Sequence, residues 1–143
     1  MTRSKRMQPV QRVAQGREQD AMHKLGQSQQ YLDDQLARLE ELRSYRDQYS
    51  RDFATSGGTG LDAGRLRDFR TFLGRLGEAI RQQEALVDRY RKQHEKNREH
   101  WVASRSHSQA IDKVVDRYRD QEQRQQDRRE QQESDERSQR PRK

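Results

Sequence analysis

The sequence predicts an all-α protein, a long antiparallel two-helix coiled-coil hairpin with a Gly-rich loop. Three observations support this fold class. Only 27% of the 143 residues are hydrophobic and 38% are charged, whereas a globular domain is about 45–50% apolar, so an ordinary closed core is not expected. Both prolines, Pro9 and Pro141, lie near the termini, and no residue between them must break a helix. Apolar residues also recur with a seven-residue period, which favours paired helices over disorder.

The first predicted helix covers about residues 7–54 of a single hairpin that spans residues 1–143. Its expected contact line with the second helix, the seam, advances by steps of three and four residues. The seam residues are Met7, Val10, Ala14, Arg17, Ala21, Leu25, Ser28, Leu32, Gln35, Leu39, Leu42, Arg46, Tyr49 and Phe53. This seam is weaker towards the N-terminus and contains one step of four residues where three is due.

A loop is predicted over residues 55–62, because glycine accepts positive φ at no steric cost and favours turns. Thr59 or Asp62 is the expected cap of the helix that follows. A phosphate-binding loop is excluded, because the glycine spacing is one residue too long for G-x-G-x-x-G and no strand precedes it.

The second predicted helix covers about residues 63–130 and is followed by a polar tail to residue 143. Its seam residues are Leu66, Phe69, Leu73, Leu76, Ile80, Gln83, Val87, Tyr90, His94, Asn97, Trp101, Ser104, Ser108, Ile111, Val115 and Tyr118. Eleven of these sixteen positions are apolar or aromatic, and the register never slips. Residues 119–143 contain no hydrophobic residue, so we expect a frayed or disordered solvated helix there.

Two apolar surfaces are left over by this pairing. With the turn near Gly58, Val10 lies opposite about residue 106, and the second helix beyond about residue 110 has no partner within the chain. The apolar residues of that part either insert into another protein or pack on residues 7–13 in a shifted register; they are Ile111, Val114, Val115 and Tyr118. Nearer the loop, off-seam residues either cover the seam edge or form a partner-binding patch; they are Tyr45, Phe72 and Ala79.

No catalytic, metal or cofactor site is predicted. The chain has no cysteine, and His94 and His100 are six residues apart and so lie on different helix faces. A two-helix hairpin also offers no cleft that would exclude water. We therefore expect a protein that is not an enzyme and has neither a cofactor nor a small-molecule substrate.

The net charge of +7 permits an anionic partner, but acids and bases alternate along the chain. A helical hairpin that binds nucleic acid is an alternative, disfavoured because phosphate binding needs a local excess of cations. A coiled-coil scaffold that dimerises through its seam is a second alternative, and a membrane-surface helix a weaker third. No signal peptide and no apolar run long enough to span a membrane precedes or interrupts the helices, so we expect the chain to work where it is made.

Two blocks of the sequence resemble the flagellar export protein FliJ family. They are Leu39-Glu-Glu-Leu-Arg-Ser-Tyr-Arg-Asp-Gln-Tyr49 and Phe69-Arg-Thr-Phe-Leu-Gly-Arg-Leu-Gly-Glu-Ala-Ile80, separated by the Gly-rich loop. The resemblance extends more loosely over the whole chain. It implies a small cytoplasmic coiled coil of the flagellar type III export apparatus, peripheral to the inner membrane at the flagellar base.

The resemblance also implies partners. The family resembles the two-helix stalk of rotary ATPases, promotes assembly of the hexameric export ATPase, contacts the cytoplasmic part of the membrane export gate, and binds export chaperones. The gate contact is implied at Leu42, Tyr45, Tyr49, Phe72, Leu76, Ala79 and Gln83, where the last position is histidine in some members. The ATPase-proximal end is implied at Val10, Val13, Ile111, Val115 and Tyr118. Nucleic acid is not an expected partner.

Overall fold

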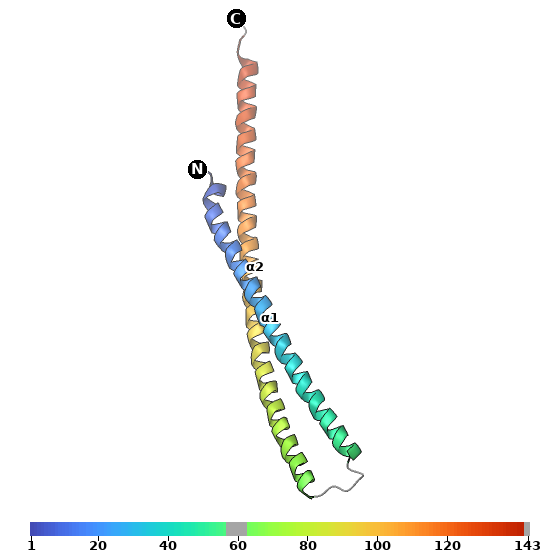
Figure 1. The fold of residues 1–143 in the computed structure, drawn as a ribbon. Helices are drawn as coiled ribbons and strands as arrows, with labels where there is room; N and C mark the ends of the chain where they lie inside the picture. The colour runs from blue at the N-terminus through green and yellow to red at the C-terminus, as the bar shows by residue number, and fades with distance from the viewer. Residues whose placement is uncertain (57–62, 142–143) are drawn as a thin grey trace. The chain divides into compact units, whose positions relative to one another are not determined.

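The computed structural model describes residues 1–56 and 63–141. It contains two helices, α1 (Arg3–Ser56) and α2 (Ala63–Gln139), which pack against each other as a hairpin (Figure 1). The predicted all-α hairpin is confirmed. Thr55 and Ser56, predicted to begin the loop, still belong to α1. The rest of the predicted loop, with the expected caps Thr59 and Asp62, lies outside the described residues.

The chain divides into two compact units, and each contains a segment of both helices. Unit 1 consists of Met1–Met22 and His100–Lys143, and unit 2 of His23–Glu99.

The core of unit 2 is a single line of side chains between α1 and α2. Its buried members are Leu32, Leu39, Leu76, Ile80 and Val87, against which Leu36, Leu42, Phe72 and Tyr90 pack. Leu32 and Leu39 are seven residues apart, as are Ile80 and Val87, which is the period predicted from the sequence. The seam prediction is therefore confirmed in this unit except at Leu66, which was predicted to lie in the seam and is 36% exposed. Burial of the core side chains is the main force that pairs the helices.

The core of unit 1 corrects part of the predicted α1 seam. Ala14, Ile111 and Val115 are buried together, with Met7 packed against them. Val10, predicted to lie in the seam, is 46% exposed, and Arg17 is also exposed. Their places are taken by Gln11 and Glu18, which are half-buried.

The polar side chain of Gln11 is accommodated in the seam because it has a partner there. Its Nε2 donates a hydrogen bond to Oδ1 of Asp112 on α2, at 2.7 Å, which offsets the cost of removing the amide from water. With Gln11 and Glu18 in the seam, the α1 spacing alternates between three and four residues without the irregular step expected from the sequence.

The prediction that α2 lacks a partner beyond about residue 110 is wrong. Ile111 and Val115 are 8% and 0% exposed, and they pack on Ala14 of α1. With the turn near Gly58, the residue opposite Gln11 was expected at about 105. Gln11 instead contacts Asp112, so the start of α1 pairs with a later part of α2 than expected. The alternative of packing on the N-terminal stretch in a shifted register is therefore confirmed for Ile111 and Val115.

The N-terminus of α1 is capped by an acid from α2. The first four N–H groups of a helix have no partner within it, and α1 has no acid in its first turn. Glu122 of α2 is the acid that caps this end. Its Oε1 accepts a hydrogen bond from the Ser4 backbone N–H at 3.0 Å, and its Oε2 accepts one from the Ser4 hydroxyl at 2.7 Å. Thr2 Oγ1 accepts more weakly from the Lys5 N–H at 3.4 Å. These contacts explain why α1 begins at Arg3, before Pro9, although about residue 7 was expected.

We expect this cap to weaken in acid. Two hydrogen bonds donated by Ser4 hold the pKa of Glu122 below its ordinary value. The bond from the Ser4 hydroxyl has the larger effect, and the bond from the Ser4 backbone N–H the smaller. A lowered folded-state pKa means that the stabilisation is present above the ordinary glutamate pKa of about 4.3 and is lost as pH falls through the lowered value. The Ser4 amide proton shift, followed by NMR, should titrate with Glu122.

Glu122→Gln should abolish this titration and speed hydrogen exchange at residues 3–6, because the neutral amide is a weaker acceptor. Glu133→Gln, an exposed acid further along α2, is the matched control. An unchanged Ser4 titration in the Glu122 variant would mean that another acid holds the helix start.

The polar tail is helical to Gln139, although a frayed or disordered segment was expected. Glutamine amides donate to acids four residues later, in three pairs: Gln123–Asp127, Gln126–Glu130 and Gln131–Asp135, at 3.0–3.1 Å. Each such pair stabilises a helix by about 0.2–0.5 kcal/mol. The segment is therefore helical although it contains no hydrophobic residue.

Candidate partner-binding surfaces

The candidate gate-contact residues of unit 2 come together around an aromatic cluster from both helices. Tyr45 and Tyr49 of α1 lie with ring centroids 5.9 and 4.3 Å from that of Phe72 on α2. Tyr49 also stacks on Phe69, 5.5 Å away. We call the seven predicted residues, Leu42, Tyr45, Tyr49, Phe72, Leu76, Ala79 and Gln83, the near-loop patch.

Members of the near-loop patch differ in their exposure. Tyr45 is 53% exposed. Leu42, Tyr49, Phe72 and Ala79 are half-buried. Leu76 is only 7% exposed and belongs to the core, so it supports the patch from beneath.

Gln83 is held in place by α1. Its Nε2 donates to the backbone carbonyl and to Oε1 of Gln35, both at 2.9 Å. A glutamine at this position therefore joins the two helices with its amide, while its side chain also borders the exposed surface.

A shallow groove of about 490 Å³ opens at the patch. It is lined by Leu42, Tyr45 and Gln83, and by two charged residues that the sequence analysis did not include, Arg38 and Glu41. Arg38 lies seven residues before Tyr45 and so on the same side of α1. That spacing was the signal that could have identified it.

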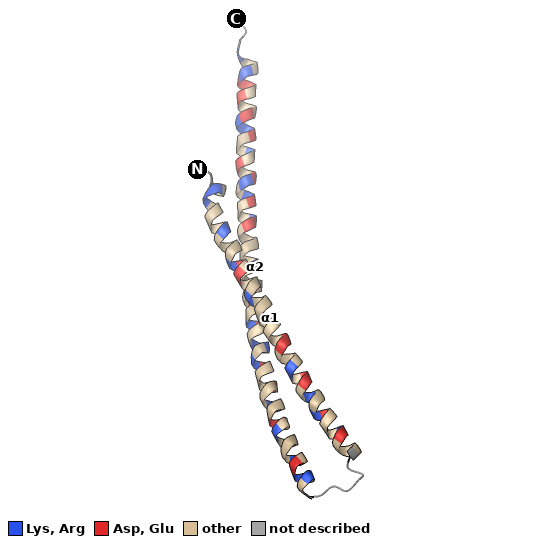
Figure 2. Ribbon diagram, in the orientation of Figure 1, with Lys and Arg blue, Asp and Glu red and all other residues tan. Residues whose placement is uncertain are grey.

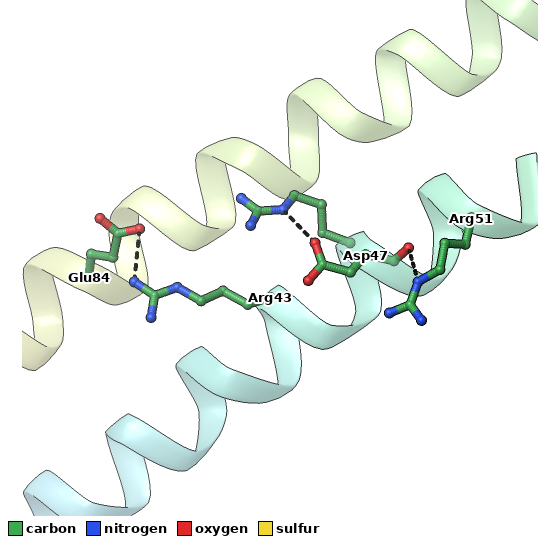
Figure 3. Close-up of polar contacts among 5 residues, drawn as sticks. Arg43, Asp47, Arg51 and Glu84 are labelled. Atoms are coloured by element: carbon green, nitrogen blue, oxygen red, sulfur yellow. Dashed lines mark hydrogen bonds and ion pairs between the residues drawn. The ribbon is translucent and has the colours of Figure 1, made fainter. Parts of the chain in front are cut away.

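An ion pair also links the two helices of unit 2. Arg43 of α1 pairs with Glu84 of α2 at 3.6 Å (Figure 3). Asp47 contacts Arg46 at 3.6 Å, and its backbone carbonyl accepts from Nε of Arg51 at 3.4 Å (Figure 3).

In unit 1 the predicted ATPase-proximal residues separate into two groups. Ile111 and Val115 are buried in the core, so they are engaged within the chain. Val13 is 55% exposed and, with Val10, lines a groove of about 290 Å³ whose other residues are Pro9, Ala14, Arg17 and His107. Tyr118 is half-buried, with the Arg3 guanidinium 5.8 Å from its ring centroid. The predicted contact at this end therefore depends on Val10, Val13 and Tyr118.

Charges of both signs are interspersed along α1 and α2 (Figure 2). Lys92 pairs with Asp88 at 3.1 Å, as the spacing predicts, and Arg81 pairs with Glu78 at 2.7 Å. The hydrogen bond from Arg81 and its positive charge lower the pKa of the Glu78 carboxyl. Among residues 1–56 and 63–141, no group of three or more acidic or histidine side chains is placed to hold a metal ion. Within the same residues, neither helix is long and apolar enough to cross a membrane.

Comparison with protein families matches the chain to the family described as "Flagellar FliJ protein", over residues 3–141. No curated protein and no solved structure matches the chain. The family match covers both helices and both candidate surfaces.

Proposed function

Because the chain belongs to the flagellar FliJ protein family, a non-enzymatic component of the flagellar export apparatus, we propose that it links the parts of that apparatus. In this proposal it contacts the cytoplasmic part of the membrane export gate and promotes assembly and coupling of the hexameric export ATPase. It also binds export chaperones, and it acts at the cytoplasmic face of the flagellar base.

The gate contact is assigned to the near-loop patch. The observation that supports it is the exposure of Tyr45 at 53% beside the half-buried Phe72. Two helices need only their seam residues to pair, so an aromatic ring left largely in water beside the seam favours a partner that covers it. Tyrosine is among the residues that contribute most to protein–protein affinity.

The ATPase contact is assigned to the groove of unit 1 that contains Val10 and Val13. Val10 and Val13 are exposed valines on one side of α1, and their exposed side chains are not needed to pair α1 with α2. The chaperone contact is assigned to no residues.

The test is binding of the purified chain to the cytoplasmic domain of the export gate from the same bacterium, measured by calorimetry. We expect Tyr45→Ala to weaken binding about tenfold or more, since truncating a central aromatic anchor costs about 2 kcal/mol. Tyr45 is preferred over Leu76, because loss of the buried Leu76 side chain would also destabilise unit 2.

Met22→Ala is the control, because Met22 is 63% exposed and lies outside the patch. Equal helicity of all chains is checked by circular dichroism. If the native chain does not bind the gate domain and instead shifts a DNA duplex with steep salt dependence, the nucleic-acid alternative replaces this proposal.

A further inference from the structure

Helix α1 contains a proline close to its start. The helix begins at Arg3, so residues 3–8 precede Pro9 within it. A proline inside a helix cannot donate a hydrogen bond to the carbonyl four residues earlier, here that of Lys5, and its ring crowds that carbonyl. Proline also disfavours the helical conformation of the residue before it, which is Gln8. Residues 3–8 are therefore joined to the rest of α1 at a weak point.

We call residues 3–8 the strap. The strap is too short to form a stable helix alone, because isolated helices of fewer than about 12–15 residues are marginal in water. With Pro9 weakening its connection to the rest of α1, its helical form depends on contacts with α2.

The contacts between the strap and α2 are few and mainly polar. Within residues 3–8, Ser4 is buried and Met7 is half-buried, whereas the other side chains are exposed. Ser4 donates its backbone N–H and its hydroxyl to the Glu122 carboxylate. The Arg3 guanidinium lies 5.8 Å from the ring centroid of Tyr118, and Met7 packs against the buried cluster of unit 1.

A space remains between the strap and α2. Its volume is about 270 Å³, and it is lined by Thr2, Arg3, Tyr118, Gln121, Glu122 and Gln125. Well-packed protein interiors leave few voids larger than a water molecule, so the strap fits α2 poorly. Beyond Pro9 the contact is different, because Ala14 is buried against Ile111 and Val115 and Gln11 bonds Asp112.

We propose that the strap opens from α2 as one unit, with Pro9 as its hinge, while unit 1 beyond Pro9 stays paired. Opening breaks the contact between Ser4 and Glu122 and uncovers the ring of Tyr118. The closed strap thus covers a residue on which the predicted contact at this end of the hairpin depends. The inference concerns the chain alone, so it holds or fails independently of the proposed partners.

The first test is amide hydrogen exchange of the full chain, followed by NMR. The N–H groups of residues 10–12 donate to carbonyls of the strap, so they lose their acceptors when it opens. We therefore expect the amides of residues 4–12 to exchange with one common opening constant and those from Val13 onward to be better protected.

Pro9→Ala should remove this step and slow exchange of residues 4–12 about tenfold or more, because alanine is a far better residue than proline inside a helix. Gln8→Ala changes the exposed neighbour of Pro9 and keeps the proline, so it is the matched control and should retain the step.

Two results of the exchange experiment would overturn the strap. A gradual rise in protection from Ser4 inward, without a step, would mean ordinary fraying of a helix end. Equal protection of residues 4–12 and of residues 14–21 would mean that unit 1 opens only as a whole.

The second test is hydroxyl-radical footprinting of Tyr118, read by mass spectrometry. Glu122→Gln should increase oxidation of Tyr118, because the neutral amide is a weaker acceptor for Ser4, and Pro9→Ala should decrease it. Tyr45 lies in unit 2 and is the internal reference, whose oxidation should not change. Unchanged oxidation of Tyr118 in both variants would mean that the strap does not cover this ring.

Discussion

Leu39→Ala is expected to lower the free energy of unfolding of unit 2 by about 2–5 kcal/mol. Leu39 is 5% exposed and lies in the buried cluster with Leu76 and Ile80. Truncation removes its transfer free energy and leaves a cavity that the neighbouring side chains fill only in part. Hydrogen exchange of amides in His23–Glu99 would measure the change as a loss of protection.

Leu66→Ala is the matched control, since the same atoms are removed from a side chain that is 36% exposed. Its expected cost is below about 1 kcal/mol. Equal losses in the two variants would mean that the buried cluster that contains Leu39 is not the core of unit 2.

Val115→Asp is expected to open the helix pair of unit 1 at neutral pH. Val115 is 0% exposed and packs with Ala14 and Ile111. An unpaired buried carboxylate costs about 3–5 kcal/mol. Burial raises the folded-state pKa of such an acid, so the loss should be largest above the raised pKa and diminish as pH falls below it. Fluorescence of Trp101, the single tryptophan and a member of unit 1, is the readout.

Val102→Asp introduces the same charge at a valine of α2 that is 48% exposed. It should change the stability of unit 1 by no more than about 0.5 kcal/mol. If both variants open unit 1 equally, Val115 does not contribute more than a surface position, and the N-terminal stretch of α1 is not packed on it.

The fold could be predicted because a seven-residue period needs no information about distant contacts. The α2 seam from Phe69 to Tyr118 is buried or half-buried at every position predicted. The α1 seam failed where hydrophobicity was used to choose between neighbours. Val10 is more apolar than Gln11, but Gln11 forms a hydrogen bond with Asp112 on the facing helix. That contact depends on the register between the two helices, which could not be predicted from the sequence.

The sequence predicted which residues lie near the candidate surfaces, but it predicted less well which of their side chains are exposed. Tyr45 and Phe72 were identified as off-seam aromatic residues, and they do meet. Ile111 and Val115 were thought to lack a partner only because the register was placed too early, and burial removes the reason for assigning them to another protein. Arg38 was missed because the prediction of this surface considered apolar side chains beside the seam, whereas the groove is also lined by this charged residue.

The unbroken alternation of the α1 seam, with Gln11 and Glu18 included, limits how the length of this protein can change. One inserted residue turns all later side chains of a helix by about 100°, so that Leu32 and Leu39 would leave α2 and polar neighbours would enter. Insertions or deletions of seven residues, made in both helices, preserve every facing pair. Relatives whose paired helical segments differ in length are therefore expected to differ there by whole heptads, in matched places on the two helices.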